Sequence, residues 1–454
     1  MAQYGPFQGI EIEFDLHGNP VDDANNALTL DASAKLLADA MRAAGGVSDL
    51  IVITHGWNND KKQARDLFTA FFETARKLVA TGKIVLPAGR KAFVAAVLWP
   101  SARFVDPSEI PGGAAAVGDT NLALIQQQLV VLKAAFVGDA SAQASLDAAL
   151  AAVPVIETDV NARRTFVEAL AALPSADAEE HDSITTNVID AVASTKKTGA
   201  DTDVTDLLRA LGMQPAPQAP PPIDQPDDAG GATGNIFAGI KAGALSLASL
   251  FTYKTMKERA GVVGRTGLAG VLGRTRAAFP TLKFHLAGHS FGARLVTSAA
   301  NTPWIGGDAT NQATTLALLQ GAFSHFGFAV NYLSLGHNGG FRDVVGKPTV
   351  SGTIVITHSS HDAAVGWAYP AASIVLGQVA DGVASANPFG GMGADGAVST
   401  PEAIFDDLGE VGHVYTPLPA RIRVRNLSGD AFISGHGDIT GEQVVYATLG
   451  NAFR

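Results

Sequence analysis

The stretch Leu286-Ala287-Gly288-His289-Ser290-Phe291-Gly292-Ala293-Arg294 decides how the rest of the chain is interpreted. Residues 282–286 alternate between apolar and polar and predict a strand, whereas 293–300 predict a helix. A Gly-x-Ser-x-Gly pentapeptide lies at the turn between them. Its two glycines leave room for a sharp turn that would lift the Ser290 hydroxyl clear of the sheet, at the positive end of the helix. This pattern is typical of a nucleophile elbow and predicts Ser290 as a nucleophile.

Apolar runs alternate with helical patterns on both sides of this turn. The run 50–54 is continuously apolar, as in strands that are buried on both faces of a parallel sheet. Residues 420–426 alternate as an edge strand would. The rhythm predicts an α/β fold with a mostly parallel central sheet. We expect strands at 9–15, 50–54, 91–98, 282–286, 316–320, 352–357 and 420–426, and helices at 31–43, 61–80, 293–300 and 441–452.

Residues 102–265 interrupt this rhythm with helical patterns and a Pro-rich linker at about 214–228. They predict a helical cap inserted into an α/β core made of 1–101 and 266–454. An insertion just ahead of the nucleophile could cover an active site and line its pocket; the alternative is a side domain that only adds stability. The helices expected in it are 121–137, 141–152, 161–172, 183–193 and 236–251.

Composition excludes several classes of function. The chain has 454 residues, 47% hydrophobic and 17% charged, and can bury a large core. A net charge of -11 without a basic cluster argues against a nucleic-acid partner. Without cysteine there is no disulfide and no thiolate nucleophile or ligand. The N-terminus does not resemble a signal peptide and the apolar run 236–251 is too short to span a membrane, so we expect a cytoplasmic protein without a transmembrane segment.

A serine nucleophile needs a histidine base and an acid that orients the base. In an open parallel sheet, catalytic groups collect beyond the C-terminal ends of the strands. Asp362 follows the strand 352–357, and His436 follows the last expected strand. The order Ser, Asp, His is the one expected for an elbow of this kind, and it predicts a triad of Ser290, Asp362 and His436.

Other residues compete for these roles. Asp343 is the alternative acid, and the alternative bases are His358, His361 and His413. Asp438 fits a role in capping the closing helix or stabilising its loop. The histidines of 355–361 lack acidic partners at ligand spacing, so we expect no metal site. His285 fits a structural role in its strand.

Two backbone N–H groups are candidates for stabilising an oxyanion. One belongs to Phe291, the residue after the nucleophile, and the other to Trp57, in the loop that follows the strand 50–54. Gly56 would let that loop approach the substrate closely. We also assign substrate contact to His289, although the turn could point its ring away as a packed or hydrogen-bonded residue.

With these residues together, the sequence resembles the α/β-hydrolase superfamily. The elbow, the His55-Gly56-Trp57 loop and the Trp99-Pro100-Ser101 segment carry the resemblance, which covers 50–101 and 280–454 but not 102–265. It implies ester hydrolysis through an acyl-enzyme on the serine, with the late histidine as base and then acid. No cofactor would be needed.

The leading hypothesis is therefore a serine esterase or lipase-like enzyme that acts on a small-molecule, apolar ester, because 102–265 is rich in Ala, Leu and Val. The same triad could serve a serine peptidase or amidase. A hydrolase-fold binding or scaffold protein is the alternative from a different class. An intact nucleophile, base, acid and oxyanion loop argue against that alternative, since a scaffold needs none of them. No feature of the sequence indicates an oligomeric state.

Overall fold

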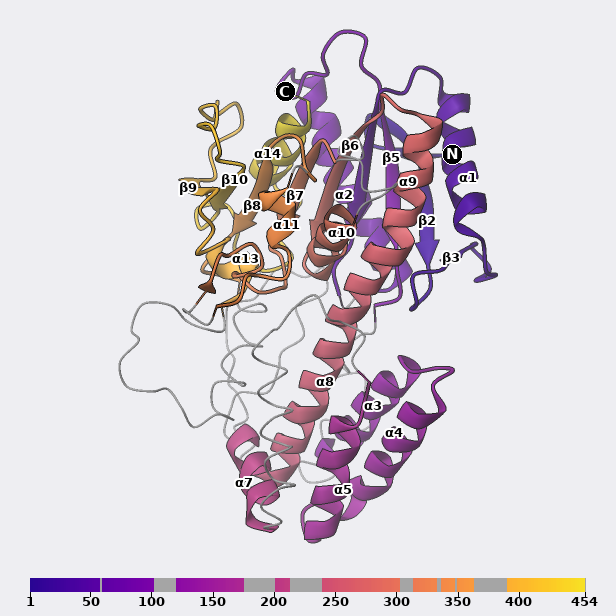
Figure 1. The fold of residues 1–454 in the computed structure, drawn as a ribbon, viewed down its shortest axis with the longest axis vertical. Helices are drawn as coiled ribbons and strands as arrows, with labels where there is room; N and C mark the ends of the chain where they lie inside the picture. The colour runs from indigo at the N-terminus through magenta and orange to yellow at the C-terminus, as the bar shows by residue number, and fades with distance from the viewer. Residues whose placement is uncertain are drawn as a thin grey trace.

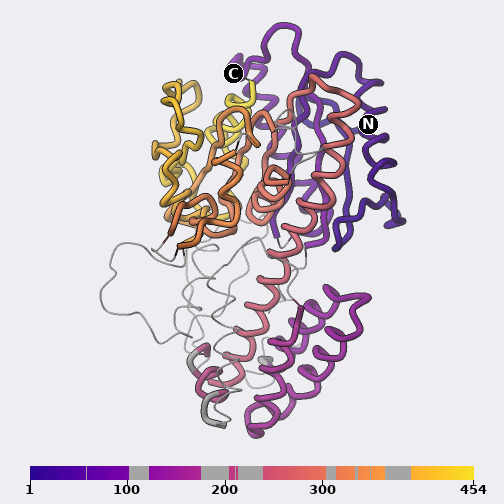
Figure 2. Tube along the Cα trace, in the orientation of Figure 1, coloured from indigo at the N-terminus to yellow at the C-terminus, as the bar shows by residue number. Residues whose placement is uncertain are grey.

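The computed structural model has two parts, a sheet covered by helices and a group of helices that the long helix α8 (Ile240–Val262) joins to the sheet (Figure 1). The Cα trace in Figure 2 places both chain ends in the part that contains the sheet. The structure describes residues 1–57, 59–101, 120–174, 201–212, 239–302, 313–332, 336–347, 349–362 and 390–453.

In these residues ten strands form one sheet, in the order β1-β2-β5-β4-β6-β7-β8-β10-β9 with β3 paired to β2. Neighbouring strands are parallel from β2 across to β9, whereas β1 and β3 run antiparallel to β2. The predicted α/β fold with a mostly parallel central sheet is confirmed. The strands are β1 (Ala2–Tyr4), β2 (Phe7–Phe14), β3 (Pro20–Val21), β4 (Asp49–Thr54), β5 (Ala92–Leu98), β6 (Lys283–His289), β7 (Thr315–Leu319), β8 (Ile354–His358), β9 (Ala403–Asp407) and β10 (Val424–Ser428).

Helices cover both faces of the sheet, and the side chains of β4 show why its sequence is apolar throughout. Leu50 and Val52 belong to one hydrophobic core, and Ile51 and Ile53 to the other. Successive side chains of a strand point to opposite faces, so a strand buried on both sides cannot alternate with polar residues. The first core includes residues of α1 (Leu30–Ala44), α9 (Ala269–Ala278) and α10 (Phe291–Asn301); the second includes residues of α2 (Lys61–Ala80) and α14 (Glu442–Ala452).

The described residues between β5 and α9 form helices and the turns that join them, and include no strand. α8 is longer than the predicted helix 236–251, and it continues through a π-helical turn, Val263–Leu268, into α9. The predicted boundary at 265 therefore falls inside one continuous helical run (Figure 1). The predicted helix 183–193 and Pro-rich linker 214–228 lie outside the described residues. The other helices of this part are α3 (Thr120–Ala134), α4 (Ala140–Ala152), α5 (Val160–Ala171) and α7 (Asp201–Gly212).

The prediction of an edge strand at 420–426 is wrong. β10 lies between β8 and β9, and β9, which the sequence analysis did not identify, is the edge. Arg425 is buried in β10, where it pairs with Asp406 of β9 and lies over the ring of Tyr415 at 5.2 Å. The ion pair and the ring satisfy the buried guanidinium, so an arginine that suggested a solvent-facing position lies inside the sheet.

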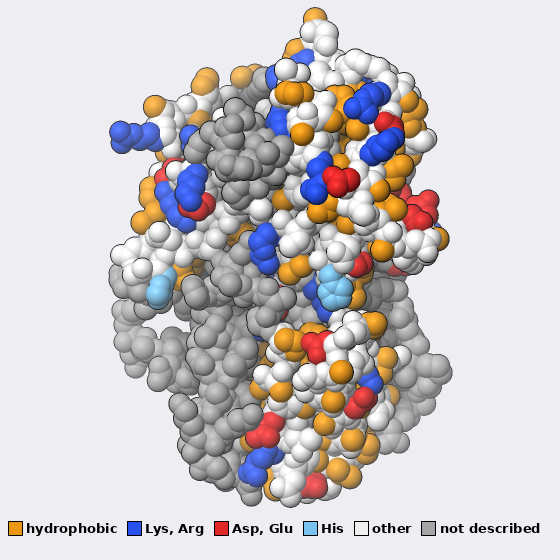
Figure 3. All heavy atoms as spheres, turned by 45° about the vertical axis from the view of Figure 1, so that its right-hand side comes forward, with side chains coloured by type: hydrophobic (Ala, Val, Ile, Leu, Met, Phe, Trp, Pro, Cys, Tyr) orange, Lys and Arg blue, Asp and Glu red, His pale blue; other side chains and the backbone are white. Residues whose placement is uncertain are grey.

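Within the described chain, no helix combines the length and apolar character that crossing a membrane requires. The face in Figure 3 carries acidic and basic side chains among scattered apolar ones, without a gathered basic patch. The described residues on this face therefore lack the clustered positive charge that binds nucleic acid.

Candidate active site

Ser290 occupies a strained turn between β6 and α10. Its φ of +57° and ψ of -123° lie in a region that L-residues rarely adopt. Its N–H donates to Leu319 O at 3.0 Å, and its carbonyl oxygen accepts from Ala293 N and Ala322 N at 3.0 and 3.1 Å. These bonds from β7, its following loop and α10 hold the strained residue in place.

Two glycines permit the turn by leaving out their side chains. A Cβ at Gly288 would overlap the carbonyl oxygen of Gly292. A Cβ at Gly292 would lie 2.5 Å from His55 O, closer than van der Waals contact allows. The Gly-x-Ser-x-Gly spacing thus follows from how tightly β6, α10 and the loop after β4 meet.

A continuous set of hydrogen bonds joins the three residues that the sequence predicted as a triad. His436 Nε2 lies 2.8 Å from Ser290 Oγ, and His436 Nδ1 lies 2.9 and 3.0 Å from the two carboxylate oxygens of Asp362. All three side chains are buried. They come from the C-terminal ends of β6 and β8 and from the loop that follows β10.

The hydrogen-bond partners determine which nitrogen of His436 carries the proton. An ionised carboxylate only accepts hydrogen bonds, so Asp362 fixes the proton of His436 on Nδ1. The lone pair on Nε2 is then free to accept the Ser290 hydroxyl proton. The arrangement can therefore transfer a proton from Ser290 to His436 while Asp362 stabilises the imidazolium.

The alternative acid does not contact this relay. Asp343 is in the short helix α11 (Arg342–Gly346), is 53% exposed and pairs with Lys347 at 2.5 Å. It follows a different loop from Asp362. The hydrogen bonds to His436 therefore favour Asp362 for the acid.

The alternative bases have other partners in the structure. His361 Nδ1 donates to Ile433 O at 3.1 Å, the ring of His358 lies 5.9 Å from that of Phe405, and the ring of His413 lies 4.7 Å from that of Tyr415. Among the described histidines, only His436 is placed by a hydrogen bond on Ser290.

Phe291 and Trp57 both lie against the elbow. Phe291 is the first residue of α10, so its N–H has no carbonyl partner within the helix. Gly56 is so close that a Cβ there would lie 2.6 Å from Ser290 Cβ, and this brings the loop of Trp57 beside the nucleophile. The rings of Trp57 and Phe291 are 5.5 Å apart. Both predicted oxyanion donors thus belong to segments that touch Ser290.

His55 shapes that loop, a role which the sequence analysis did not identify. Trp99 N donates to His55 Nε2 at 3.3 Å, so the ring proton is on Nδ1, which donates to Gly56 O at 2.8 Å. Burial lowers the pKa of His55 to about 4 and keeps the ring neutral. Trp99 stacks on it at 5.7 Å and donates from Nε1 to His55 O. The only signal of this contact in the sequence was that the motifs of His55 and Trp99 each follow an expected strand.

Tyr253 of α8 also reaches the site. Its ring centroid is 4.8 Å from that of Phe291 and 5.7 Å from that of Trp57. These three residues form an aromatic cluster where the inserted helices meet the elbow. Nothing in the sequence marks Tyr253, because the contact depends on how α8 packs against α10.

Two residues near the relay stabilise the loop of His436. His289 is buried, and its Nε2 donates to His436 O at 2.8 Å, which fits the hydrogen-bonded turn residue rather than a substrate contact. Asp438 Oδ2 accepts from Ser434 N and Oγ, both at 3.2 Å. Since α14 begins after Gly441, Asp438 stabilises its loop and does not cap the helix.

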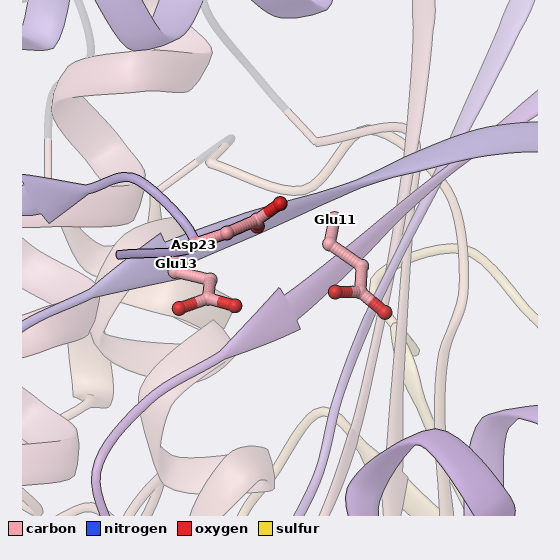
Figure 4. A group of neighbouring side chains, drawn as sticks. All are labelled: Glu11, Glu13 and Asp23. Atoms are coloured by element: carbon pink, nitrogen blue, oxygen red, sulfur yellow. The ribbon is translucent and has the colours of Figure 1, made fainter. Parts of the chain in front are cut away.

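One acidic cluster in the described residues could be considered for a metal ion. The oxygens of Glu11, Glu13 and Asp23 come within 4.8 Å of one another, and Figure 4 shows the side chains gathered beside β2. Lys61 pairs with Glu13 at 2.5 Å, and Arg65 pairs with Glu11 at 2.6 Å. These cations already compensate most of the negative charge that would attract a metal.

A cavity of about 350 Å³ lies at the opposite end of the sheet from the relay. Lys283, Thr315 and Thr353, at the start of β6, at the start of β7 and just before β8, contribute to its wall. No residue of the relay lines this cavity, so it is separate from the candidate active site.

No protein-family model matches the chain, and searches of curated proteins and of solved structures find no significant match. The geometry of the site therefore carries the functional argument.

Proposed function

We propose that the chain is a serine hydrolase of the α/β-hydrolase type that cleaves carboxylic esters. The observation that carries this proposal is the unbroken hydrogen-bonded relay from Ser290 through His436 to Asp362, which begins at a serine with a φ of +57°. Backbone strain persists where the surrounding structure enforces it, and such strain is concentrated at functional sites. A structural serine would need neither the strained turn nor a histidine with an acid behind it.

In the proposed reaction, Ser290 Oγ attacks the ester carbonyl as its proton passes to His436 Nε2. Asp362 stabilises the resulting imidazolium. The negative charge on the carbonyl oxygen is stabilised by the N–H groups of Phe291 and Trp57. As the tetrahedral intermediate collapses, the alcohol leaves with the proton from His436. Water then attacks the acyl-enzyme by the same route and releases the acid.

The helices between β5 and β6 would act as a cap over this site. The support is the aromatic cluster, through which Tyr253 of α8 contacts both Trp57 and Phe291. Aromatic side chains beside the nucleophile favour an apolar substrate, because burial of apolar surface contributes about 25 cal/mol per Å². We therefore expect an ester with a hydrocarbon acyl chain.

Hydrolysis of p-nitrophenyl esters from acetyl to long acyl chains tests the proposal, with a p-nitroanilide assayed beside them. A fluorophosphonate probe should label the wild type and not Ser290→Ala. The matched control is Ser33→Ala, which removes a buried serine in α1 and should keep full labelling. Faster turnover of the anilide would favour an amidase. Absence of both labelling and turnover would contradict the proposal and leave a binding protein.

A further inference from the structure

The loop that carries His436 is held by side chains from three neighbouring strand ends. His289 ends β6 and donates to His436 O at 2.8 Å. Gln320 follows β7 and donates from Nε2 to Asp438 O at 3.3 Å. Ser359 follows β8 and donates from Oγ to Ile433 O at 3.0 Å. The three donors, which we call the loop clamp, act on backbone carbonyls on both sides of His436 and at the residue itself.

His289 is suited to this contact because its proton position and charge are both fixed. A carbonyl oxygen only accepts, so the His289 proton lies on Nε2. Burial, together with the nearby His436, lowers the pKa of His289 to about 3 and keeps it neutral. Its ring lies 4.9 Å from that of His436. A charged residue here would oppose formation of the His436 imidazolium, whereas a neutral donor does not.

The conformation of Gln320 is also fixed by its surroundings. It is fully buried and has a φ of +40°, which is unusual for a residue with a side chain. Its Oε1 accepts from Thr357 Oγ1 at 2.8 Å, and this bond orients its amide so that Nε2 points to Asp438 O. Strain at this position indicates that the surroundings determine its conformation.

We infer that His289 and Gln320 are positioning residues that hold the His436 loop so that the histidine reaches Ser290. This inference rests on the proposed function and adds to it the residues that place its base. Asp362 orients the ring of His436, but the backbone of His436 follows its loop. Because Nε2 must stay within hydrogen-bond reach of Ser290 Oγ, a displacement of about 1 Å could cost about 100-fold in rate.

Two substitutions at His289 separate positioning from packing. His289→Leu fills the site without a donor, whereas His289→Gln keeps an N–H near the position of Nε2. We expect kcat for the best ester to fall about 10-fold to 100-fold in His289→Leu, with KM changed by less than about threefold, and to recover mostly in His289→Gln. His413→Gln, in an exposed loop, is the control. Equal rates for His289→Leu and the wild type, or equal losses in both His289 variants, would overturn the inference.

A measurement without substrate separates this inference from the proposed function. The His436 Nδ1 proton, shared with Asp362, should give a downfield NMR signal that is assigned by its loss in Asp362→Asn. We expect the signal to weaken in His289→Leu and to return in His289→Gln, even if no ester is turned over. Gln320→Met provides a second test if His289→Leu does not fold. A His436 signal that is the same in wild type and in every folded clamp variant would contradict the clamp.

Discussion

The two ends of the sheet contain the same kind of side-chain relay in different surroundings. At the C-terminal ends of the strands, Asp362 and His436 lead to Ser290. At the N-terminal ends, Asp49 Oδ1 lies 2.9 Å from His285 Nε2, and His285 Nδ1 lies 2.9 Å from Thr315 Oγ1. Both sets are a buried acid, a buried histidine and a hydroxyl.

The neighbouring residues show which set could be catalytic and which is structural. Asp49 also accepts from Arg90 and from Ser48 Oγ. Burial opposes ionisation of Asp49, but hydrogen bonds from His285, Arg90 and Ser48 outweigh it and hold its pKa well below the usual range. Thr315 begins a strand, so no helix N-terminus follows it. An acid, a histidine and a hydroxyl therefore form a candidate catalytic site only where a strained turn presents the hydroxyl beside oxyanion donors.

Replacing the two histidines should give the largest contrast. We expect His436→Gln to lower kcat by about 10⁵-fold to 10⁶-fold, because the nucleophile loses its base. His285→Gln should leave turnover within about twofold and lower the free energy of unfolding by about 1–3 kcal/mol, through a lost buried hydrogen bond. Ester hydrolysis and urea denaturation of both variants would show this. Loss of turnover in a folded His285→Gln would remove the distinction between the two ends.

Replacing the two acids should give the same kind of contrast, with a smaller effect on kcat than replacing the two histidines. Asp362→Asn should lower kcat by about 10⁴-fold through the wrong histidine tautomer. Asp49→Asn should instead cost about 3–5 kcal/mol of stability, since it leaves the half-buried Arg90 without its charge partner. Asp343→Asn is the matched control for the rate. A near-normal rate for Asp362→Asn would exclude it as the acid of the relay.

The sequence predicted most of the strands but few of the contacts between side chains of different strands. The runs at 50–53 and 92–98 are apolar throughout because they are buried on both faces, and the sequence pattern shows this directly. The edge was misjudged because Arg425 is neutralised by Asp406, a partner distant in sequence. β9 was missed because its residues are mostly half-exposed and partly acidic.

The same division holds for the site. Ser290, Asp362 and His436 could be proposed because each follows a predicted strand, and their order matches an elbow-type hydrolase. Tyr253 and Gln320 could not, since their roles depend on the path of α8 and on the packing between neighbouring strand ends. A local sequence pattern shows where a strand lies and where it ends. It does not show which side chains from other elements reach that end.

Gly56 offers a milder test of the same comparison. It lies just beyond the C-terminal end of β4, whereas Asp49 lies at the start of that strand. Gly56→Ala would place a methyl group 2.6 Å from Ser290 Cβ, so the oxyanion loop must move. We expect kcat to fall about 100-fold, as for loss of one oxyanion donor. Gly441→Ala, where the added Cβ meets nothing within 4 Å, is the control. If Gly56→Ala kept full turnover, the loop of Trp57 would have no role in the reaction.

The smallest effect is the dependence of stability on pH, which should arise at the C-terminal end from His55 and His289. Burial lowers their pKa values to about 4 and about 3, so both rings stay neutral in the folded chain while the unfolded chain takes up protons below about pH 6.5. Their contribution is fully present above that pH and is lost as the pH falls toward the folded values. Each should cost about 2 kcal/mol at pH 5.

Urea denaturation at pH 7.5, 6 and 5 measures this loss. Depressed carboxyl pKa values act only below about pH 4 and so do not contribute in this window. Burial also lowers the pKa values of His285 at the other end and of His358 at the end of β8, so His285→Gln and His358→Gln are necessary comparisons. His289→Gln should remove about 1.4 kcal/mol per pH unit from the slope, because glutamine does not titrate. An unchanged slope in His289→Gln would mean that His289 is protonated in the folded chain, and then its Nδ1 would need a partner of its own.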